Sequence, residues 1–293
     1  TEIAQYLQWK FKLTYDPNDE MIITVGASQA IDLAIRAIID HGDEVLVVEP
    51  CFVAYSAIVS LAGGVPVAVP TSADNDFKLL PKQIEEQLTA NTKAIMLSFP
   101  NNPTGATMTK EELQQIAEIA KKHDLLVLTD EIYAELSYDE AHTSIAALPG
   151  MKERTIYISG FSKAFAMTGW RIGYVAAPAE FIDAMFKIHQ YAMMCAPTMA
   201  QYGALEALRN GFDDVADMVK SYRQRRNFFV KSCQEIGLPC HLPGGAFYAF
   251  PSIAETGLTA DQFAEQLLHE EHVAVVPGDV FGSGGEGHIR CSY

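Results

Sequence analysis

Short apolar runs rich in β-branched residues alternate with longer segments of helical period along most of the chain, and no other feature restricts the fold as strongly. Runs of this length between turn residues are typical of buried strands. We predict strands at residues 22–25, 45–48, 65–69, 94–99, 125–129 and 156–158. Near-continuous apolar strands separated by helices form a mostly parallel sheet that is covered on both faces. The chain is therefore predicted to have a three-layer α/β/α fold.

Helical patterns occupy the segments between these strands. The apolar segment 30–39 follows the first strand, and segment 54–62 follows the second. Thr109 stands three residues before Glu112, which is the capping-box pattern at the start of a helix. An amphipathic helix is also expected at the amino end, from Glu2 onward.

The character of the sequence changes after Gly211. Residues 212–236 form one long helical pattern with charge on one side, and residues 259–269 predict another helix. Strand-like runs occur at residues 244–251, 273–276 and 287–292. We therefore expect a large domain at residues 1–211 and a smaller α+β domain at residues 212–293.

Both ends of the chain look cut. The chain starts at Thr1 without a methionine and stops at Tyr293 directly after an expected strand, so the smaller domain is expected to be incomplete. The alternative is that both termini are natural, because threonine at position 1 is a suitable helix cap.

The charge balance argues against two classes of partner. Of the 293 residues, 21 are Lys or Arg and 37 are Asp or Glu, which gives a formal net charge of −16. A chain this acidic repels nucleic-acid phosphates and anionic lipid, and it contains no apolar stretch near the roughly 18 residues that span a bilayer. Its five cysteines are scattered without C-x-x-C spacing, which favours buried free thiols in a cytoplasmic protein.

Chemically distinctive residues follow five of the predicted strands. In open parallel sheets, ligands bind beyond the carboxyl ends of the strands, where these residues would meet. The first strand leads into the small-residue turn 26–29 at a helix start, whose free N–H groups can hold a phosphate. The later strands are followed by Phe52, Asn102, Asp130, Tyr133 and Lys163.

Arg171 is expected at the same edge. Only seven residues separate it from Lys163, and the apolar run 172–177 follows it. A parallel crossover needs a dozen or more residues, so this run is predicted to be the one strand antiparallel to its predecessor. Its amino end, with Arg171, then lies beside the carboxyl ends of the other strands.

Each of these residues also has an ordinary structural explanation. Asp130 can cap a helix, Phe52 can belong to the core, Arg171 can form a surface ion pair, and Lys163 can be solvated. A shared location at one sheet edge argues against all of these explanations holding together.

Pyridoxal 5′-phosphate is the cofactor that would use the whole set. The Lys163 amine can form a Schiff base with its aldehyde, and the Asp130 carboxylate would keep the pyridine nitrogen protonated. Tyr133 and Asn102 are suited to donate hydrogen bonds to the phenolate oxygen. Phe52 is suited to stack on the ring.

The phosphate of the same cofactor would be held at the first helix. The backbone N–H groups of Ala27 and Ser28, together with the Arg171 guanidinium, are suited to neutralise it. Neither hydride transfer nor phosphoryl transfer requires such a combination of groups.

Three motifs carry a family resemblance. They are Asn-Pro-Thr-Gly at 102–105, Asp-Glu-Ile-Tyr at 130–133 and Ser-Lys-Ala-Phe-Ala-Met-Thr-Gly-Trp-Arg-Ile-Gly-Tyr at 162–174. In order and spacing they resemble the class I and II aminotransferases of pyridoxal-phosphate fold type I, and the similarity runs over essentially the whole chain. The resemblance implies that Lys163 binds the cofactor and moves a proton at the substrate α-carbon. It also implies ring contacts from Asp130, Tyr133 and Asn102.

The resemblance implies binding roles for two further residues and leaves the serine contact to the phosphate open. Arg171 is implied to bind the phosphate, and Arg290 to bind the substrate α-carboxylate; a strand-edge ion pair is the alternative for Arg290. Many relatives carry a serine three residues before the lysine, where this chain has Gly160. The adjacent Ser162 is expected to bind the phosphate instead.

The implied activity is transfer of an amino group from an L-amino acid, with aromatic donors favoured, to a 2-oxo acid such as 2-oxoglutarate. Residues 28–32 and 210–214 resemble the bacterial branch with aromatic and acetyl-diaminopimelate aminotransferases. Relatives are homodimers with sites at the subunit interface, so a homodimer is expected. The alternatives are a carbon–sulfur β-lyase on the same scaffold and a non-catalytic ligand-sensing domain, although no basic helix-turn-helix is present.

Two further motifs are interpreted as structural. Residues 282–287 spell G-x-G-x-x-G, but they precede a strand instead of opening a helix, so a turn is expected and not a dinucleotide site. His269 and His272 are three residues apart, whereas a zinc protease helix needs four, and no metal site is expected.

Overall fold

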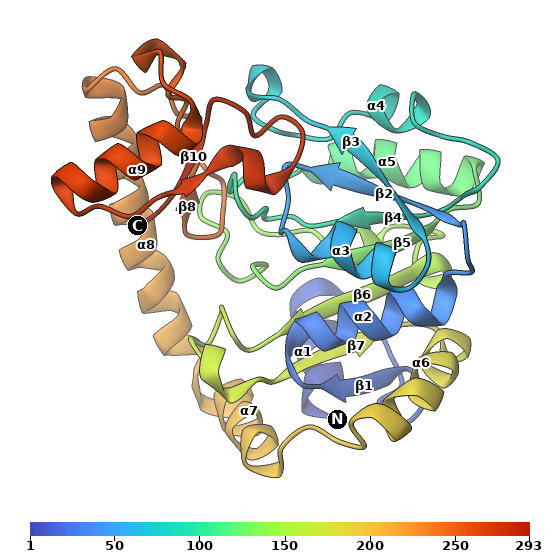
Figure 1. Cartoon of the computed structure of the whole chain (residues 1–293). Helices are drawn as coiled ribbons and strands as arrows, with labels where there is room; N and C mark the ends of the chain where they lie inside the picture. Colours follow the sequence, from blue (N-terminus) through green and yellow to red (C-terminus); the bar gives the residue numbers. More distant parts are fainter.

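The computed structural model describes all 293 residues and contains two sheets (Figure 1). The large sheet has seven strands in the order β1-β7-β6-β5-β4-β2-β3, and the small sheet has three in the order β8-β10-β9. The large sheet comprises β1 (Met21–Thr24), β2 (Glu44–Glu49), β3 (Val65–Pro70), β4 (Thr92–Leu97), β5 (Leu126–Asp130), β6 (Thr155–Gly160) and β7 (Gly173–Ala176). All six predicted strands are therefore present, as is the run after Arg171.

Nine α-helices connect and cover these strands. They are α1 (Glu2–Phe11), α2 (Gly26–Ile38), α3 (Ala54–Leu61), α4 (Pro81–Glu85), α5 (Lys110–Lys122), α6 (Ala179–Ala192), α7 (Thr198–Asn210), α8 (Phe212–Glu235) and α9 (Ala260–Glu271). The capping box at α5 is confirmed, since the Glu112 N–H donates to Thr109 Oγ1 and the Thr109 N–H donates to Glu112 Oε2. Thr1 occupies the cap position of α1 without a side-chain hydrogen bond to the helix.

The direction of β7 confirms the prediction made from its short connection. The neighbouring strands β2, β3, β4, β5 and β6 are parallel to one another, whereas β7 is antiparallel to both β6 and β1. Gly160 at the end of β6 pairs with Gly173 at the start of β7. This register places the residues that follow β6 beside the residues that precede β7.

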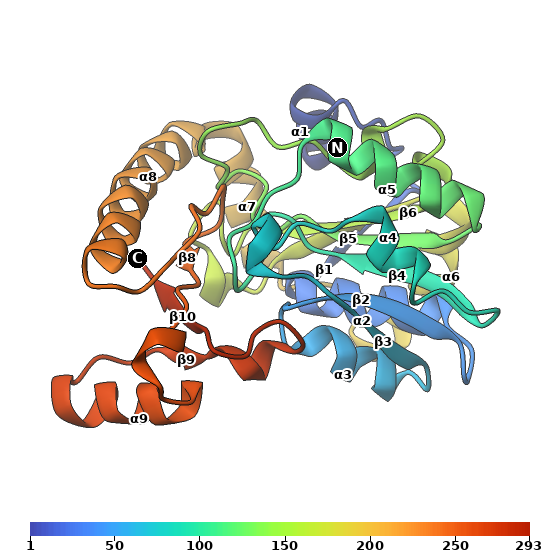
Figure 2. The same cartoon turned by 90° about the horizontal axis from the view of Figure 1, so that it is seen from above.

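Helices cover both faces of the large sheet, which confirms the three-layer prediction. Alternate residues of β2 face opposite sides: Leu46 packs with the helix α5 side, and Val47 packs with the helices α2 and α3. Figure 2 shows α1 and α5 above the sheet and α2 and α3 below it. Each fully buried aliphatic side chain of these two layers contributes about 1.5–3 kcal/mol to stability.

The C-terminal region, residues 212–293, contains α8, α9 and the small sheet of β8 (Tyr248–Ala249), β9 (Val276–Pro277) and β10 (Ile289–Ser292). It lies beside the carboxyl edge of the large sheet (Figures 1 and 2). A strand at 273–276 was expected, yet only Val276 of that run joins a strand. Helix α9 extends to Glu271, and the His272 and Val273 N–H groups bond to its last carbonyls, so residues 273–275 return the chain to the sheet.

Gly211 separates α7 from α8, at the position where the sequence changes character. The division into domains at 1–211 and 212–293 stays a prediction.

The cysteines differ from the expectation at one position. Cys51, Cys233, Cys240 and Cys291 are buried free thiols, but Cys195 is exposed because it lies in the connection between α6 and α7.

Candidate active site

One cavity of about 240 Å³ lies at the carboxyl edge of the large sheet, facing the C-terminal region. Every residue predicted for the site lines it: Ala27, Ser28, Phe52, Asn102, Asp130, Tyr133, Ser162, Lys163, Arg171 and Arg290. The structure thus brings the whole predicted set together, including Arg290 from β10, which is the residue farthest along the chain.

Strand and helix ends determine these positions. Asp130 is the last residue of β5, and Tyr133 lies in the turn that follows it. Lys163 follows the end of β6, and Arg171 directly precedes the apolar residues of β7. The parallel strands and the single antiparallel strand therefore supply an acid, a phenol, an amine and a guanidinium to one edge.

The Asp130 carboxyl group is almost completely buried. Burial raises its pKa from 3.8 to about 6, and two hydrogen bonds partly oppose that shift. The Tyr55 hydroxyl donates to Oδ2 at 2.8 Å, and the Ile132 N–H donates to Oδ1 at 3.2 Å. Both bonds stabilise the ionised form, so this site favours a carboxylate that faces a positive group.

The Lys163 amine lies between aromatic rings inside the cavity. Its Nζ is 5.8 Å from the centre of the Tyr133 ring and 5.6 Å from the centre of the Phe247 ring. Burial lowers its pKa, and the nearby positive charges of Arg290 and Arg171 lower it further. A lowered pKa increases the unprotonated fraction of the amine, and that form is the nucleophile and the base.

Arg290 is held mainly by ring stacking. Its guanidinium carbon lies 4.7 Å from the centre of the Tyr248 ring and 4.9 Å from that of Phe281. Nη1 donates to Asn102 Oδ1 at 2.9 Å, and the buried Nε has no hydrogen-bond partner. The Asn102 oxygen is occupied by this bond, so its amide N–H₂ group remains available as a donor.

The start of α2 forms an open cradle next to Arg171. No side chain caps this helix, so its first N–H groups are available to an anion. Gly26 has φ +76°, and a Cβ atom there would overlap the Arg171 guanidinium. Glycine therefore allows the helix start and the arginine to converge on one point.

Ser162 lines the cavity, whereas position 160 has no room for a side chain. A Cβ atom on Gly160 would lie 2.9 Å from the Ile172 carbonyl oxygen and 3.0 Å from Gly173 Cα. A serine side chain at this position would need the β6–β7 pair to separate slightly.

Two functional candidates were missed by the sequence reasoning. Tyr55 bonds to Asp130, and the Tyr248 hydroxyl lies 2.9 Å from the Tyr133 hydroxyl. Both line the cavity. Tyr55 lies in the first turn of α3, and no local sequence pattern indicates that this side chain reaches Asp130.

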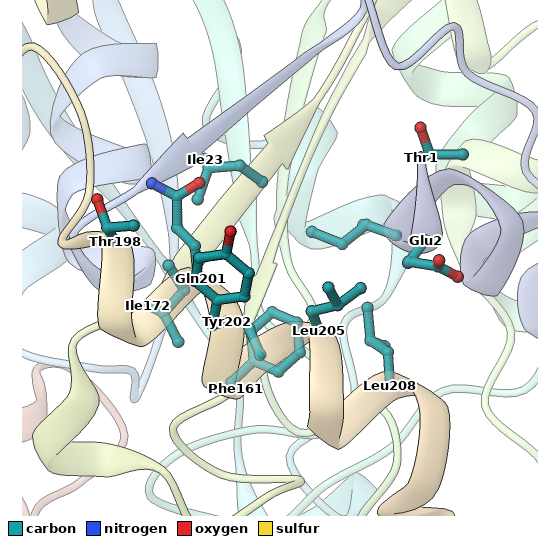
Figure 3. Close-up of a pocket in the computed structure, with 12 residues that line it drawn as sticks. Thr1, Glu2, Ile23, Phe161, Ile172, Thr198, Gln201, Tyr202, Leu205 and Leu208 are labelled. Atoms are coloured by element: carbon teal, nitrogen blue, oxygen red, sulfur yellow. The ribbon is translucent and has the colours of Figure 1, made fainter.

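A larger cavity of about 570 Å³ lies elsewhere, between α1, α7 and the large sheet (Figure 3). Its lining is mostly apolar, with Phe161, Leu205 and Leu208 among the labelled residues. It contains none of the predicted site residues and neither lysine nor arginine. The reactive groups of the chain are therefore at the smaller cavity.

Known aminotransferases resemble this chain over essentially its whole length. Residues 1–293 match the sequence model of the family "Aminotransferase class I and II". The chain is 66% identical over 292 residues to the putative aminotransferase YugH of Bacillus subtilis, and the match covers 100% of this chain and 76% of that protein. It is 47% identical to an aspartate aminotransferase of Pyrococcus abyssi, covering 99% of this chain and 76% of that protein.

The fold agrees with solved structures of the same kind. An aromatic aminotransferase from Pyrococcus horikoshii superimposes with a TM-score of 0.98 at 45% identity, covering 100% of this chain and 79% of that chain. Sequence, fold and the convergence of amine, acid and guanidinium groups lead to one assignment. The chain belongs to the class I and II aminotransferases, which are pyridoxal 5′-phosphate enzymes of fold type I.

Proposed function

We propose that this aminotransferase moves the amino group of an L-amino acid, with aromatic donors favoured, to a 2-oxo acid such as 2-oxoglutarate. One observation carries the proposal: the Lys163 amine and the Arg290 guanidinium line the same cavity as the buried Asp130 carboxyl. An amine for the reacting carbon and a planar cation for a carboxylate are the two groups that an α-amino acid requires.

The residues present fit pyridoxal phosphate. The buried Asp130 carboxyl suits a protonated ring nitrogen, since that positive charge would keep it ionised at neutral pH. The bound cofactor supplies a ring that takes up the electron pair left when a proton leaves the substrate α-carbon. The open start of α2 beside Arg171 is a suitable site for its phosphate.

The remaining ring contacts come from side chains already held in place. Tyr133 and the free Asn102 amide would donate to the phenolic oxygen, while Phe52 would stack on the ring face. Tyr248 supports this arrangement because its hydroxyl lies 2.9 Å from that of Tyr133. Burial raises the pKa of Tyr133 well above its usual value, which keeps its hydroxyl protonated as a donor.

The phosphate contacts combine backbone and side-chain donors. Ala27, Ser28, Ser162 and Arg171 all line the cavity, and they carry backbone N–H groups, a hydroxyl and a guanidinium that suit a phosphate. These donors would neutralise a dianion and orient it, so the position of the ring follows from the position of α2.

The Lys163 amine would bind the cofactor and then move the proton at the substrate α-carbon. Its lowered pKa leaves more of the amine unprotonated at neutral pH. Arg290 would hold the α-carboxylate and thereby fix the α-carbon within reach of that amine.

The proposed preference for aromatic donors rests on the positive charges at the cavity and on the aromatic rings next to two of its lining tyrosines. The three cations at the cavity are Lys163, Arg171 and Arg290, and each has a proposed task, so none remains for a side-chain carboxylate. The Phe247 ring stacks on that of Tyr222 at 5.4 Å and lies 5.6 Å from the ring of Tyr133 and 4.7 Å from that of Tyr248, two tyrosines that line the cavity. This favours an uncharged aromatic substrate over an acidic one.

A second copy of this chain is the proposed partner. Large apolar side chains are exposed along the end of α6, its connection to α7, and α7: Tyr191 at 88%, Met194 at 79%, Met199 at 81% and Tyr202 at 69%. Exposed Trp170 is the residue next to Arg171, so the patch approaches the site. Several large exposed apolar side chains on consecutive elements are typical of a subunit interface. Sedimentation of the holoenzyme as a monomer would contradict this assembly.

We also propose a cytoplasmic location, which the five free cysteines favour. No helix is both long enough and apolar enough to cross a membrane.

A two-domain organisation divided at Gly211 is supported by the two separate sheets and the break between α7 and α8. Limited proteolysis that cuts first near residue 211 would test it.

A half-reaction panel tests the proposed activity. Holoenzyme is mixed with each amino acid in turn, and the loss of absorbance of the lysine-bound cofactor is followed. We expect the fastest loss with an aromatic amino acid, recovery on addition of 2-oxoglutarate, and formation of glutamate. Release of pyruvate and ammonia without glutamate would instead indicate a β-lyase.

A further inference from the structure

The glycine-rich segment 282–287 contacts the large sheet in a way that the proposed function does not explain. Glu49 is the last residue of β2, and its Oε2 accepts two hydrogen bonds from Ser283, from N–H at 2.7 Å and from Oγ at 2.8 Å. We propose that this contact, the Glu49 latch (Glu49 with residues 282–284), positions Arg290 for the substrate carboxylate. The inference rests on the proposed role of Arg290.

The latch requires glycine on both sides of Ser283. Gly282 has φ +98° and Gly284 has φ +81°, which are conformations that other residues rarely adopt. A Cβ atom on Gly282 would overlap the Glu49 carboxylate, and one on Gly284 would overlap the Thr71 carbonyl oxygen. The G-x-G motif therefore has a physical explanation: it allows a loop backbone to approach a carboxylate closely.

Further hydrogen bonds join the end of β2 to β3 on one side and to the segment before Gly282 on the other. The Thr71 N–H and Oγ1 donate to the Glu49 carbonyl oxygen at 2.7 Å and 2.8 Å, which fixes the end of β2 against the end of β3. The Cys51 N–H donates to the Phe281 carbonyl oxygen at 2.9 Å. The short 3₁₀ helix η6 (Gly278–Phe281) is thus held against the large sheet at its last residue.

Phe281 connects the latch to Arg290. Its ring is buried and lies 4.9 Å from the Arg290 guanidinium carbon. Arg290 has only one side-chain hydrogen bond, to Asn102, and its Nε has none. Its direction therefore depends on the rings of Phe281 and Tyr248, and Phe281 in turn depends on the latch.

This arrangement separates substrate binding from cofactor binding. Glu49 does not line the cavity, and of the residues proposed to bind the cofactor only Phe52 follows the strand end that the latch holds. Every amino acid and 2-oxo acid substrate carries the α-carboxylate that Arg290 would bind. Loss of the latch is therefore expected to weaken the binding of both substrates together and to change cofactor affinity much less, through Phe52 alone.

The primary test is Glu49→Ala in the holoenzyme with L-phenylalanine and 2-oxoglutarate. We expect KM to rise about 10-fold for both substrates, with kcat within about 2-fold of wild type, since one misplaced carboxylate contact is worth about one factor of ten. Competitive inhibition by 3-phenylpropionate, which carries the carboxylate, is expected to weaken by the same factor. Inhibition by 3-phenylpropan-1-ol, which lacks the carboxylate, is expected to stay unchanged.

Matched variants identify the interaction. Glu49→Gln keeps an oxygen acceptor for both Ser283 donors, so it is expected to restore KM to within about 3-fold of wild type. Ser283→Ala removes one donor and keeps the backbone one, so a rise in KM of about 3-fold is expected. Glu44→Ala is the control, because Glu44 lies at the opposite end of β2 and accepts from Thr89 and Thr92.

A double-mutant cycle tests whether the effect acts through Arg290. In an Arg290→Gln background, Glu49→Ala is expected to have no further effect on KM. Additive effects of the two changes would show that Glu49 acts by another route, and would overturn the inference.

The outcomes separate the two proposals. The latch is overturned if Glu49→Ala weakens inhibition by 3-phenylpropionate and by 3-phenylpropan-1-ol equally, or if its KM is unchanged, in an enzyme whose wild type transaminates. If Glu49→Ala does not fold, Ser283→Ala carries the same test, and an unchanged KM there overturns the latch. A wild type that transaminates no amino acid overturns the proposed function instead.

Discussion

Lys163 and Asp130 are held in a different way from Arg290, although all three line one cavity. The first two follow directly from the ends of β6 and β5, and the hydrogen-bonded register of the sheet fixes the backbone on both sides. Arg290 lies on the short strand β10, which pairs with β9 at two positions only. Its guanidinium is directed by two rings and one asparagine oxygen.

This difference indicates that the two sheets have different proposed tasks, with the cofactor bound at the large sheet and the substrate carboxylate at the small sheet. The groups proposed to hold the cofactor stand on a seven-stranded sheet whose faces are both packed, so they are arranged before any ligand arrives. The group proposed to bind the substrate stands on a separate three-stranded sheet, and the glycine-rich segment that precedes its strand β10 contacts the large sheet at Glu49. Mutations should therefore be able to change cofactor binding and substrate binding separately, and the following variants test that separation.

The largest effect is expected at the sheet edge. Lys163→Ala removes the amine that would bind the cofactor and move the α-proton, so kcat should fall by about 10⁴-fold or more. Half-reaction rates measure this loss, and borohydride reduction of the wild type should place the mass label on residue 163. Lys187→Ala is the control, because that lysine is exposed on α6 and pairs only with Asp183. A mass label on a different lysine would contradict the assignment.

The next largest effect compares the two arginines. Arg290→Gln should lower kcat/KM for amino acids by about 10²–10³-fold, since it removes up to two charge-assisted hydrogen bonds to the carboxylate. Arg171→Gln should instead weaken binding of pyridoxal phosphate to the apoenzyme. Equilibrium dialysis of the cofactor and steady-state kinetics separate the two. If Arg290→Gln releases the cofactor, the proposed separation is wrong.

A smaller effect concerns the pH dependence of cofactor binding. Burial raises the pKa of Asp130 to about 6, and the Tyr55 hydroxyl opposes that rise by bonding to the ionised form. Tyr55→Phe should therefore raise this pKa by about one further unit, given about 1.4 kcal/mol per unit. Cofactor affinity of the apoenzyme, which needs the carboxylate, should be lost at correspondingly higher pH.

Titration of cofactor affinity between pH 5 and 8 measures the shift. Tyr15→Phe provides the matched control, because the buried Tyr15 hydroxyl has no hydrogen-bond partner and Tyr15 does not line the cavity. A midpoint that stays in place, or moves to lower pH, would mean that Tyr55 does not act on Asp130.

The smallest effect is expected in the glycine-rich segment. Gly287→Ala changes a residue with φ +70° and open space around it, so it should lower the free energy of unfolding by about 1 kcal/mol and leave KM unchanged. Gly282→Ala adds overlap with Glu49, so it should destabilise by about 1–3 kcal/mol more and raise KM a few-fold. Urea unfolding and steady-state kinetics provide both measurements. Equal KM values in the two variants would remove the link between this segment and substrate binding.

The sheet edge could be predicted from sequence because its geometry is set locally. A short apolar run followed by turn residues ends a strand, and parallel strands end at one edge, so Asp130 and Lys163 are brought together without knowledge of the packing. The short connection from Lys163 to Arg171 likewise allows only an antiparallel return.

Other features depend on contacts that no local pattern encodes. Glu49 and Ser283 are 234 positions apart, and only the docking of the C-terminal region brings them together. Tyr55 reaches Asp130 because of the rotation of α3 about its axis, which the sequence pattern does not specify. Helices α6 and α7 have no counterpart among the predicted elements, because exposed apolar residues such as Tyr191 and Met199 obscure their amphipathic period.

The antiparallel return between β6 and β7 has a consequence for how this catalytic centre can vary. Lys163 and Arg171 lie at the two ends of one tight chain reversal, so the register of β6 and β7 fixes the distance between the amine proposed to bind the cofactor and the guanidinium proposed to bind its phosphate. Inserting even a few residues between Lys163 and Arg171 would shift the amine relative to the guanidinium. The length of this reversal is therefore expected to stay constant when the scaffold acquires new substrates, and variation is expected in segments that hold neither of these two groups.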